Sequence, residues 1–514
     1  MDPKFIKENA PLIRENEINR NGSPDLVDTI VLEYQRIVKL DFIISQLKRG
    51  RNLSGPLMKG QVSETSNQLE YTDQVWIKFL DDLSEKSTSE RALTALSQLN
   101  RKGLISLLKQ IKLELIKSEN EIKGLRQSSL TKSQELGNII PLNVHQFSKD
   151  KAYTATKEIP YILGPNSPLL GPVKKEPNVK FEMKWITNKD HSEQVLYVSE
   201  TPHHLYELEN LGEELKGHCQ LTKDLKLVDY DESIKVAGNR GYSFLDLGVK
   251  LNRALMNYAV DFLSEHDYSL VETPHMMTAG SLSGVTQLTD FQESLYPVGR
   301  QETDPKLIDE NKFLIATSEQ PLTAFYRDKV LRSSFFPIRR GGISHCYRKE
   351  AGSHGVDTRG IFRVHQFQKI EQFAITNPEN SWDEMARMIK ISAEFYDTLG
   401  LKYRIIKVAS NDINTSASMK YDLEGYFPNS KKYRELVSCT NCTDYIARKI
   451  HCRTDQQRIP HFLNSTLCAN TRVICCLLET YQDPKNNLVN LPDVLIPYMN
   501  GIVQLKDTGL KDSN

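Results

Sequence analysis

The first 130 residues carry two long stripes of apolar residues at helical spacing. Ser23-Pro24 is typical of a helix start, and apolar residues then recur at steps of three and four between residues 26 and 47. We expect this helix to end within residues 52–56, which include Gly55 and Pro56. The second stripe consists of Leu104, Leu108, Ile111, Leu115, Ile122 and Leu125, with Ser118 in its polar slot. Because each narrow stripe can bury the other, the pattern predicts an antiparallel coiled-coil hairpin.

The second half of the chain has a mixed pattern of helices and strands. Prolines crowd residues 141–177 and indicate an irregular connector. Residues 244–262 have helical periodicity, and a short strand at 269–273 stops at Pro274. Residues 360–374 are rich in β-branched and aromatic side chains and predict a long strand. A strand at residues 346–350 is expected to pair with it antiparallel through the loop 351–359.

Side chains suited to ligand binding share faces of these two predicted strands. Alternation puts Arg348 and Glu350 on one face of the first strand. One face of the second strand is predicted to carry Arg363, His365, Phe367, Lys369 and Glu371. An arginine can clamp a phosphate, and an aromatic ring and a carboxylate ~13 Å apart could hold two ends of a ligand. An amphipathic strand with surface ion pairs would have the same pattern.

Length and composition describe a globular protein of two or three domains. The chain has 514 residues, of which 39% are apolar and 26% charged. No window approaches the ~18 uncharged apolar residues of a membrane span, and the first residues resemble neither a signal peptide nor a transit helix. All eight cysteines lie at or after Cys219, which favours a reducing compartment. We therefore expect a cytoplasmic protein without a membrane partner.

Charge gives no overall preference for nucleic acid, because Lys+Arg and Asp+Glu balance at 66 each. The second predicted helix is locally basic: Lys102, Lys109, Lys112, Lys117, Lys123 and Arg126 outnumber Glu114, Glu119 and Glu121. Such a face could bind an RNA backbone. An ordinary solvated helix surface has a similar composition, so both interpretations stay open.

Six separated stretches, in the right order, resemble the seryl-tRNA synthetases of the eukaryotic cytosolic type, which are class II aminoacyl-tRNA synthetases. Residues 344–373 (SHCYRKEAGSHGVDTRGIFRVHQFQKIEQF) resemble motif 2 in its seryl version. Residues 314–322 (LIATSEQPL) resemble the serine-binding Thr-x-Glu element, and residues 434–445 (RELVSCTNCTDY) resemble the ATP and magnesium strand. Residues 461–473 (HFLNSTLCANTRV) resemble motif 3, and Pro274 stands where motif 1 has its proline. Residues 235–242 (KVAGNRGY) fit the start of the catalytic domain, and the match covers most of residues 225–505.

The resemblance implies an α+β fold in which an antiparallel coiled-coil arm precedes a class II catalytic domain. Residues 1–140 would form an N-terminal tRNA-binding domain with the helical arm. Residues 141–230 would form a connector and the start of the body. Residues 231–514 would form the catalytic domain, an antiparallel β-sheet flanked by helices, with motif 1 around Pro274, motif 2 at 344–373 and motif 3 at 461–480.

The implied activity is that of a serine--tRNA ligase, which works in two stages. The carboxylate of L-serine attacks the α-phosphorus of ATP, giving seryl-adenylate and pyrophosphate. The 3′-hydroxyl of the terminal adenosine of tRNA(Ser) then takes the serine, and tRNA(Sec) is left open as a further substrate. No covalent enzyme intermediate is implied, so positioning and charge stabilisation supply the rate. The arm and the motif 2 loop are expected to contact tRNA, and the family is homodimeric.

By resemblance, the catalytic residues are Arg348 for the α-phosphate, Glu350 for the adenine amine and Arg472 for the γ-phosphate. The ATP site is completed by Lys349, Val364, His365, Gln366, Phe367, Glu435, Leu436, Val437 and Ser438. Phe367 would stack on adenine. Glu435 and Ser438 would coordinate Mg²⁺, which prefers oxygen ligands.

The resemblance assigns serine binding to Thr317, Ser318, Glu319, Arg348, Glu371, Asn464 and Thr466. Glu319 is expected to bind the ammonium and Glu371 the polar end. Polar groups that lose a partner would reject alanine, and a wall against one methyl group would reject threonine.

The sequence departs from the family pattern at several places. Tyr347 stands where phenylalanine is usual, and motif 3 lacks the glycine pattern of many class II enzymes. Val356 replaces an arginine that is common in the motif 2 loop, which puts contacts to the tRNA acceptor end in question. Residues 150–225 match the family poorly, and residues 203–216 within them suggest an insertion.

The cysteines raise the question of zinc. Cys439 and Cys442 have C-x2-C spacing, with His451, Cys452 and His461 downstream. The resemblance puts this segment in the ATP-binding strand region, so no structural zinc is expected. Cys475-Cys476 falls on an apolar helix and is expected in the core.

Two other functions remain as alternatives. One is a non-catalytic synthetase-like paralogue that binds RNA, and the other is an enzyme that charges another amino acid or a carrier protein. A paralogue without activity would be expected to have lost at least one catalytic residue, yet Arg348, Glu350 and Arg472 are all present. The Thr-x-Glu element argues for serine.

Overall fold

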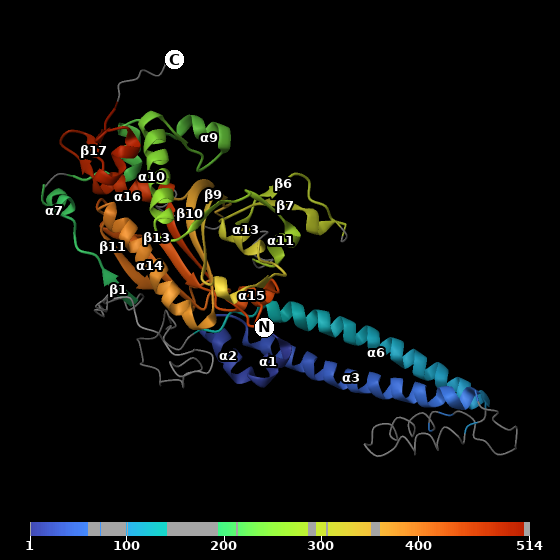
Figure 1. Ribbon diagram of the computed structural model, residues 1–514. Coiled ribbons are helices and arrows are strands. Elements are labelled where there is room, and N and C mark those ends of the chain that lie inside the picture. Colours follow the sequence, from blue (N-terminus) through green and yellow to red (C-terminus); the bar gives the residue numbers. More distant parts are fainter. Residues whose placement is uncertain are drawn as a thin grey trace. The chain divides into compact units, whose positions relative to one another are not determined.

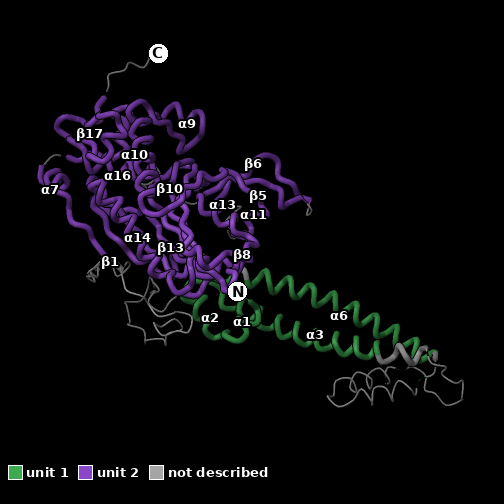
Figure 2. The backbone as a smooth tube through the Cα atoms, viewed as in Figure 1, with its two compact units in different colours: residues 1–137 green, residues 138–514 purple. Residues whose placement is uncertain are grey.

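The structure is a computed structural model that describes residues 2–59, 101–140, 194–211, 214–285, 294–304, 307–350 and 360–507, together with residues 72, 74 and 99. The chain divides into two compact units, residues 1–137 and residues 138–514 (Figure 2). Most of the predicted proline-rich connector and the motif 2 loop with Val356 lie outside the described residues.

The described part of the first unit is helical (Figure 1). Its helices are α1 Pro3–Glu8, α2 Ala10–Asn19, α3 Pro24–Lys59 and α6 Arg101–Glu135. The short helices α1 and α2 pack Ile6 and Ile13 against Val27 and Ile30 at the start of α3. This small core anchors one end of the long helix pair.

Helices α3 and α6 form the predicted antiparallel hairpin. The ion pair Lys132–Glu33 links the end of α6 to the first half of α3, and Lys48–Glu119 links the second half of α3 to the middle of α6, as expected for antiparallel helices. Their shared core consists of Ile37, Leu40, Ile44, Leu47, Leu99, Leu104, Leu107, Ile111, Leu115 and Ile122. The apolar stripes seen in the sequence therefore bury each other, as expected.

Two details of the hairpin correct the sequence prediction. Leu107 is fully buried in the seam, whereas Leu108 is only partly buried. Helix α3 does not end within residues 52–56 but continues to Lys59. Pro56 lies in the last turn, so its missing N–H removes one helical hydrogen bond close to the end of the helix, where bonds are already few.

An eight-stranded sheet forms the centre of the second unit (Figure 1). In spatial order its strands are β1 Gln194–Val198, β11 Tyr403–Lys407, β12 Met419–Phe427, β13 Lys432–Asn441, β15 His461–Ala469, β10 Gln366–Thr376, β9 Ile338–Tyr347 and β4 Ser269–Glu272. Neighbouring strands are antiparallel except β4 and β9, which are parallel. The predicted α+β fold with an antiparallel sheet and an N-terminal helical arm is confirmed.

Helices cover both faces of this sheet, and β10 shows which residues face which side. Helices α10 Asp246–Ser264, α14 Ser381–Thr398 and α16 Asn470–Thr480 pack on the face that includes Ile370 and Ala374. Helices α13 Glu319–Ala324 and α15 Tyr445–Lys449 pack on the opposite face with Phe373 and Ile375. Because side chains alternate along a strand, Lys369 shares the second face with Phe373.

Short elements complete the second unit. The remaining helices are α7 His203–Asn210, α8 His218–Asp224, α9 Asp231–Ala237 and α11 Ala279–Ser283. The remaining strands are β2 Val228–Asp229, β3 Ser243–Phe244, β5 Met276–Thr278, β6 Pro297–Val298, β7 Lys312–Leu314, β8 Val330–Leu331, β14 Arg453–Thr454, β16 Gln482–Asp483, β17 Leu488–Asn490 and β18 Gln504–Leu505. The sheet β5-β7-β6 leads directly toward α13 and so positions the Thr-x-Glu element.

Both strands of the predicted strand pair are displaced from their expected ranges: β9 begins and ends earlier than the predicted strand 346–350, and β10 begins after residue 360. Strand β9 ends at Tyr347, so Arg348 and Glu350 follow the strand instead of sharing one of its faces. Strand β10 begins at Gln366, so Arg363 and His365 precede it. Positive φ angles of 50° at Glu350 and 73° at Gly360 turn the backbone out of the sheet on either side of the loop.

The region that matches the family poorly contributes to the main sheet. Strand β1 pairs antiparallel with β11 at its edge. Helix α7 follows, and its His204 ring stacks on Tyr481 at 4.2 Å. Residues 203–211 therefore pack on the rest of the second unit.

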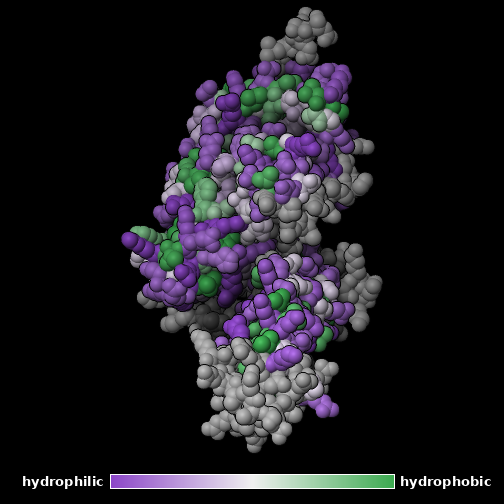
Figure 3. Space-filling view, turned by 90° about the vertical axis from the view of Figure 1, so that its right-hand side faces the viewer, coloured by the Kyte–Doolittle hydropathy of each residue, from purple (hydrophilic) through white to green (hydrophobic). Residues whose placement is uncertain are grey.

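None of the described helices is long and apolar enough to cross a membrane. On the face of the molecule in Figure 3, hydrophobic residues form scattered patches among hydrophilic ones.

Candidate active site

Glu435 and Ser438 lie on the same face of β13 because this strand contains a β-bulge. The pairing with β12 shifts register between Val437 and Glu435, which makes Leu436 the extra residue. Leu436 and Val437 are both buried, at 2% and 0% exposure, whereas Glu435 and Ser438 are partly exposed. In a regular strand, residues three apart would face opposite sides. The bulge thus brings a carboxylate and a hydroxyl together.

Arg472 is held against this pair from α16. Its Nη1 lies 3.1 Å from the Glu435 carbonyl oxygen and 3.4 Å from Glu435 Oε2. The guanidinium also stacks on the ring of Phe362 at 5.1 Å. Burial opposes ionisation of Glu435, but the positive charges of Arg472, Lys420 and Arg348 outweigh it and lower its pKa. Three cations therefore surround one carboxylate.

Asp422 belongs to the same group, although nothing in the sequence pattern predicted it. It pairs with Ser438 across β12 and β13 and is 8% exposed. Its Oδ2 lies 3.1 Å from Lys420 Nζ, and within the described part of the chain its Oδ1 has no hydrogen-bond partner. Burial, together with the negative charge of Glu435, raises the pKa of Asp422 to about 7 against the opposing effect of Lys420.

Arg348 stands just beyond β9, next to the predicted aromatic platform. Its N–H donates to the His365 carbonyl at 2.9 Å, and His365 Nδ1 contacts the Arg348 carbonyl at 2.9 Å. Its guanidinium lies over the Phe367 ring at 5.2 Å. The backbone contacts extend the β9–β10 ladder past its assigned end, and they aim Arg348 at the ring.

Glu350 lies at the edge of the described residues. Its Oε2 is 3.4 Å from Arg363 Nη1, and its carbonyl accepts from Arg240 Nη1 at 3.4 Å. The N–H of Lys349 donates to the Ser294 carbonyl at 3.0 Å. These contacts tie the segment that leaves β9 to neighbouring loops.

Of four residues predicted in the ATP site, three have side chains buried in the core and one is exposed. The side chains of Val364, Leu436 and Val437 are part of the main hydrophobic core. Gln366 is exposed, and its carbonyl accepts from the Tyr242 hydroxyl at 3.1 Å. The β-bulge explains why the neighbouring side chains of Leu436 and Val437 are both buried, and Val364 precedes β10.

A second group of polar residues lies between β10, β15 and α13, and we call it the carboxylate pocket: Glu319, Lys369, Glu371 and Asn464. Lys369 Nζ lies 2.5 Å from Glu371 Oε2, and both side chains are buried. Asn464 Nδ2 donates to Glu319 Oε1 at 2.8 Å. Burial raises the pKa of Glu319 to about 7, and Glu371 adds to this rise while Lys369 opposes it.

The other residues predicted to bind serine border this pocket. Thr466 pairs with Glu371 across β15 and β10, so both side chains share a face. The Glu319 N–H donates to Thr317 Oγ1 at 3.4 Å. Ser318 is fully buried and packs on Gly342 of β9, where an added Cβ would lie 2.5 Å from Ser318 Oγ. The structure thus brings the predicted residues of the Thr-x-Glu element next to β10 and β15.

The donors near Glu435 fit Mg²⁺ better than a soft metal. A carboxylate, a hydroxyl and Asp422 Oδ1, which has no hydrogen-bond partner among the described residues, are hard oxygen donors. Cys439 and Cys442 are buried thiols, as are Cys475 and Cys476 in the core of α16. Among the described residues, no three His, Cys, Asp or Glu side chains are grouped so as to hold a metal ion.

Comparisons with known proteins relate this chain to one group of enzymes. Residues 302–481 match the family model "tRNA synthetase class II core domain (G, H, P, S and T)". A serine--tRNA ligase from Helianthus annuus is 46% identical over 296 residues, which cover 56% of this chain and 66% of that protein. The cytoplasmic serine--tRNA ligase from Saccharomyces cerevisiae is 44% identical over 296 residues, which cover 55% of this chain and 62% of that protein. The matched segment spans just under two thirds of these curated relatives.

Similarity to solved structures extends along almost the whole chain. The cytoplasmic serine--tRNA ligase from Naegleria fowleri, solved in complex with AMP, is 34% identical with a TM-score of 0.77, and the match covers 99% of both chains. The seryl-tRNA synthetase from Pyrococcus horikoshii, complexed with ATP, is 26% identical with a TM-score of 0.71, again over 99% of both chains. On this evidence, the chain belongs to the serine--tRNA ligase family.

Proposed function

We propose that the protein is a serine--tRNA ligase that forms seryl-adenylate from L-serine and ATP and transfers serine to tRNA(Ser). The observation that carries the proposal is the proximity of two groups along one sheet. Arg348 and Arg472 act on the Glu435 carboxylate of β13, and the carboxylate pocket lies on β15, which pairs with β13, and on β10, which pairs with β15. One group suits a triphosphate and the other an amino acid.

In the first step, an oxygen of the serine carboxylate attacks the α-phosphorus, and pyrophosphate leaves in line. Arg348 would bind the α-phosphate and Arg472 the γ-phosphate, which keeps the nucleotide bent. Phe367 would stack on adenine, and Glu350 would accept from its amine. Because these groups are held by β9, β10 and α16, the rate comes from orientation and from charge stabilisation.

Glu319 would accept a hydrogen bond from the serine ammonium, and Glu371 would accept one from the serine hydroxyl. Asn464 and Thr466 would close the pocket. Alanine lacks the hydroxyl and would leave the buried Glu371 without that partner, which argues for rejection of alanine. In the second step, the 3′-hydroxyl of the terminal adenosine attacks the carbonyl of the adenylate, and AMP leaves.

Glu435 and Ser438 would hold Mg²⁺ near the triphosphate. The ion would neutralise negative charge on the phosphates. Glu435 fits this role because neighbouring cations lower its pKa and favour the carboxylate form.

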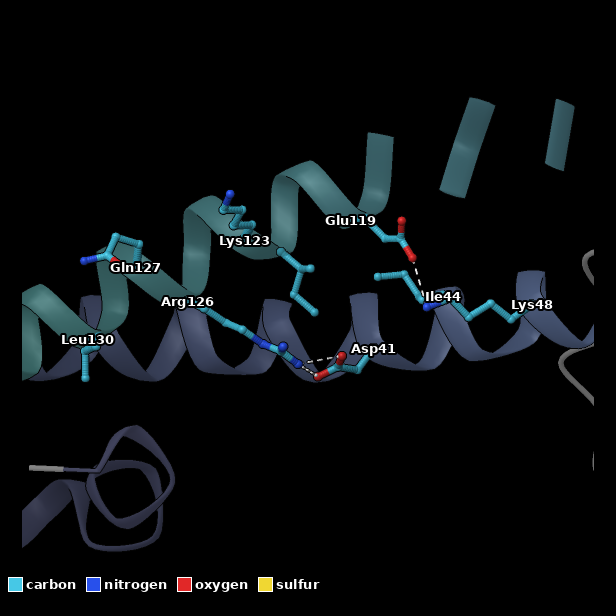
Figure 4. Close-up of a pocket in the computed structure, with 9 residues that line it drawn as sticks. Asp41, Ile44, Lys48, Glu119, Lys123, Arg126, Gln127 and Leu130 are labelled. Carbon is cyan, nitrogen blue, oxygen red and sulfur yellow. Dashed lines mark hydrogen bonds and ion pairs between the residues drawn. The ribbon is translucent and has the colours of Figure 1, made fainter. Parts of the chain in front are cut away.

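The tRNA would bind along α6, where exposed lysines lie on the side away from the seam. Lys102, Lys109, Lys112, Lys117 and Lys123 are all exposed. Arg126 pairs with Asp41 at 2.8 Å, and Lys48 pairs with Glu119, whereas Lys123 points away from α3 (Figure 4). Ion pairs between the helices therefore neutralise part of the basic charge. The proposal that this arm binds RNA rests on the exposed lysines.

The homodimer, with the region around Pro274 at its interface, and a cytoplasmic location are part of the same proposal. Several curated relatives are named as cytoplasmic enzymes. A charging assay with different tRNAs also tests whether tRNA(Sec) is a substrate.

Pyrophosphate exchange into ATP tests the first step. We expect exchange with serine and at most weak exchange with alanine, threonine, glycine or cysteine. Arg348→Ala is expected to lower kcat by about 10²–10³, the usual loss when one charge-stabilising donor is removed. Exchange with another amino acid in place of serine, or with none, would overturn the proposal.

A further inference from the structure

Lys369 is a buried lysine in the middle of the carboxylate pocket. It lies on β10, paired in register with Ser344 of β9 and Ala469 of β15. Its side chain is 7% exposed and that of Glu371 is 3% exposed, and Nζ lies 2.5 Å from Glu371 Oε2. A buried lysine is expensive unless it is paired, so this position requires a specific reason.

The charges that face Glu319 come from few elements. Strand β10 supplies the two charges that act on Glu319, those of Glu371 and Lys369. Strand β9 supplies the buried, uncharged thiol of Cys346, and Arg348 beyond the end of β9 acts on that thiol. Strand β15 supplies only the neutral Asn464 at this point. With Lys369 paired to Glu371, one carboxylate charge remains for which these residues provide no ion pair.

One remaining negative charge suits a ligand with one ammonium group. If the pocket had two carboxylates and no cation, one of them would take up a proton, as closely spaced carboxylates do. If it had two cations, it would repel the ammonium. The observed set of two acids and one base therefore selects for a single positive charge on the ligand.

We propose that Lys369 is a positioning residue that fixes Glu371 and leaves the pocket one unit of negative charge for the ammonium of serine. This inference rests on the proposed serine activation. It gives a role in serine binding to Lys369, a residue to which the family resemblance assigned no role. It also explains why a lysine is buried beside two acids.

Replacement of Lys369 by methionine should weaken the binding of serine and leave the binding of ATP unchanged. Glu371 would lose its partner, and the serine KM is expected to rise by about tenfold or more, as for other buried charges that lose a partner. Lys369 also opposes the rise in the pKa of Glu319, so its removal should raise that pKa further. The acid limb of kcat/KM for serine should therefore move to higher pH, while the KM for ATP stays within about twofold.

The experiment compares wild type, Lys369→Met and Lys369→Gln by pyrophosphate exchange between pH 5.5 and 8.5, with thermal unfolding of each variant. Lys390→Met, which removes an exposed lysine of α14 that pairs with Glu394 at 3.4 Å, is the matched control. The glutamine variant keeps a hydrogen-bond donor toward Glu371. It is measured in case the methionine variant does not fold.

A selective rise in serine KM together with the shifted acid limb would support the proposal. An unchanged limb, an equal rise in both KM values, or failure of both variants to fold would overturn it, because a positioning role predicts a folded protein that still binds ATP. Absence of exchange in the wild type would instead contradict the proposed function itself.

Discussion

Glu319 gives the site a titration near neutral pH. Burial raises its pKa to about 7, and Glu371 contributes to the rise. The serine ammonium requires the ionised carboxylate, so binding at pH 7 should release about half a proton per site, and the release should grow below pH 7 and fade at pH 8.

Calorimetry of serine binding in buffers of different ionisation enthalpy measures this release. Glu319→Gln should bind serine weakly and without the proton release. Binding heats that do not depend on the buffer at pH 7 would contradict the assignment of Glu319 to the ammonium.

Gly342 gives a residue-scale test of how tightly α13 packs on β9. An added Cβ would lie 2.5 Å from Ser318 Oγ and 2.8 Å from a methyl group of Leu322. Gly342→Ala should lower the free energy of unfolding by about 1–3 kcal/mol and raise the serine KM, because the Thr-x-Glu element must move.

Gly341→Ala is the matched control on the other face of the same strand, where Cβ would meet Leu263 and Leu270 at 2.8 and 2.9 Å. It should cost similar stability, measured by chemical denaturation, without changing the serine KM. If both variants changed the serine KM equally, the pocket would not depend on the contact between Ser318 and Gly342.

At the scale of elements, the hairpin was predictable because helical periodicity depends on local sequence. The error at Leu107 shows the limit of this approach. Leu107 and Leu108 both fit an apolar stripe, and only packing against α3 decides that Leu107 is fully buried.

Truncation of these two leucines tests the seam. Leu107→Ala should cost about 2–5 kcal/mol in the unfolding of the helical hairpin, as for other buried leucines, and Leu108→Ala clearly less. Thermal unfolding followed by far-UV circular dichroism measures both. An equal loss of stability in both variants would mean that Leu108 contributes to the seam as much as Leu107 does.

The sheet was less predictable than the helices, and the reasons lie in particular residues. Motif resemblance identified Glu435 and Ser438, but simple strand alternation would have put them on opposite faces. Only the register shift at Leu436 unites them, and a bulge has no clear signature in a single sequence. Asp422 was not predicted because its importance depends on its partner strand.

At the scale of the whole molecule, the two units have separate tasks in this account. We propose that the second unit carries out adenylate formation and that the lysines of α6 bind tRNA. Charge reversal of Lys109 and Lys112 should weaken tRNA binding and reduce its salt dependence, while serine-dependent pyrophosphate exchange stays unchanged.

Filter binding of tRNA(Ser) at several salt concentrations measures this effect. The same reversals at the exposed Lys250 and Lys506 of the second unit serve as the control. Equal weakening by both pairs would mean that tRNA responds to total charge and not to the arm.

The central claim is that this chain charges tRNA(Ser) with serine. The most direct measurement is the transfer of labelled serine to tRNA(Ser) in the presence of ATP and Mg²⁺, with a tRNA for another amino acid as the control. We predict ATP-dependent charging of tRNA(Ser) that is abolished or strongly reduced by Arg348→Ala. A folded wild-type protein that binds ATP but transfers no serine to tRNA(Ser) would contradict the account.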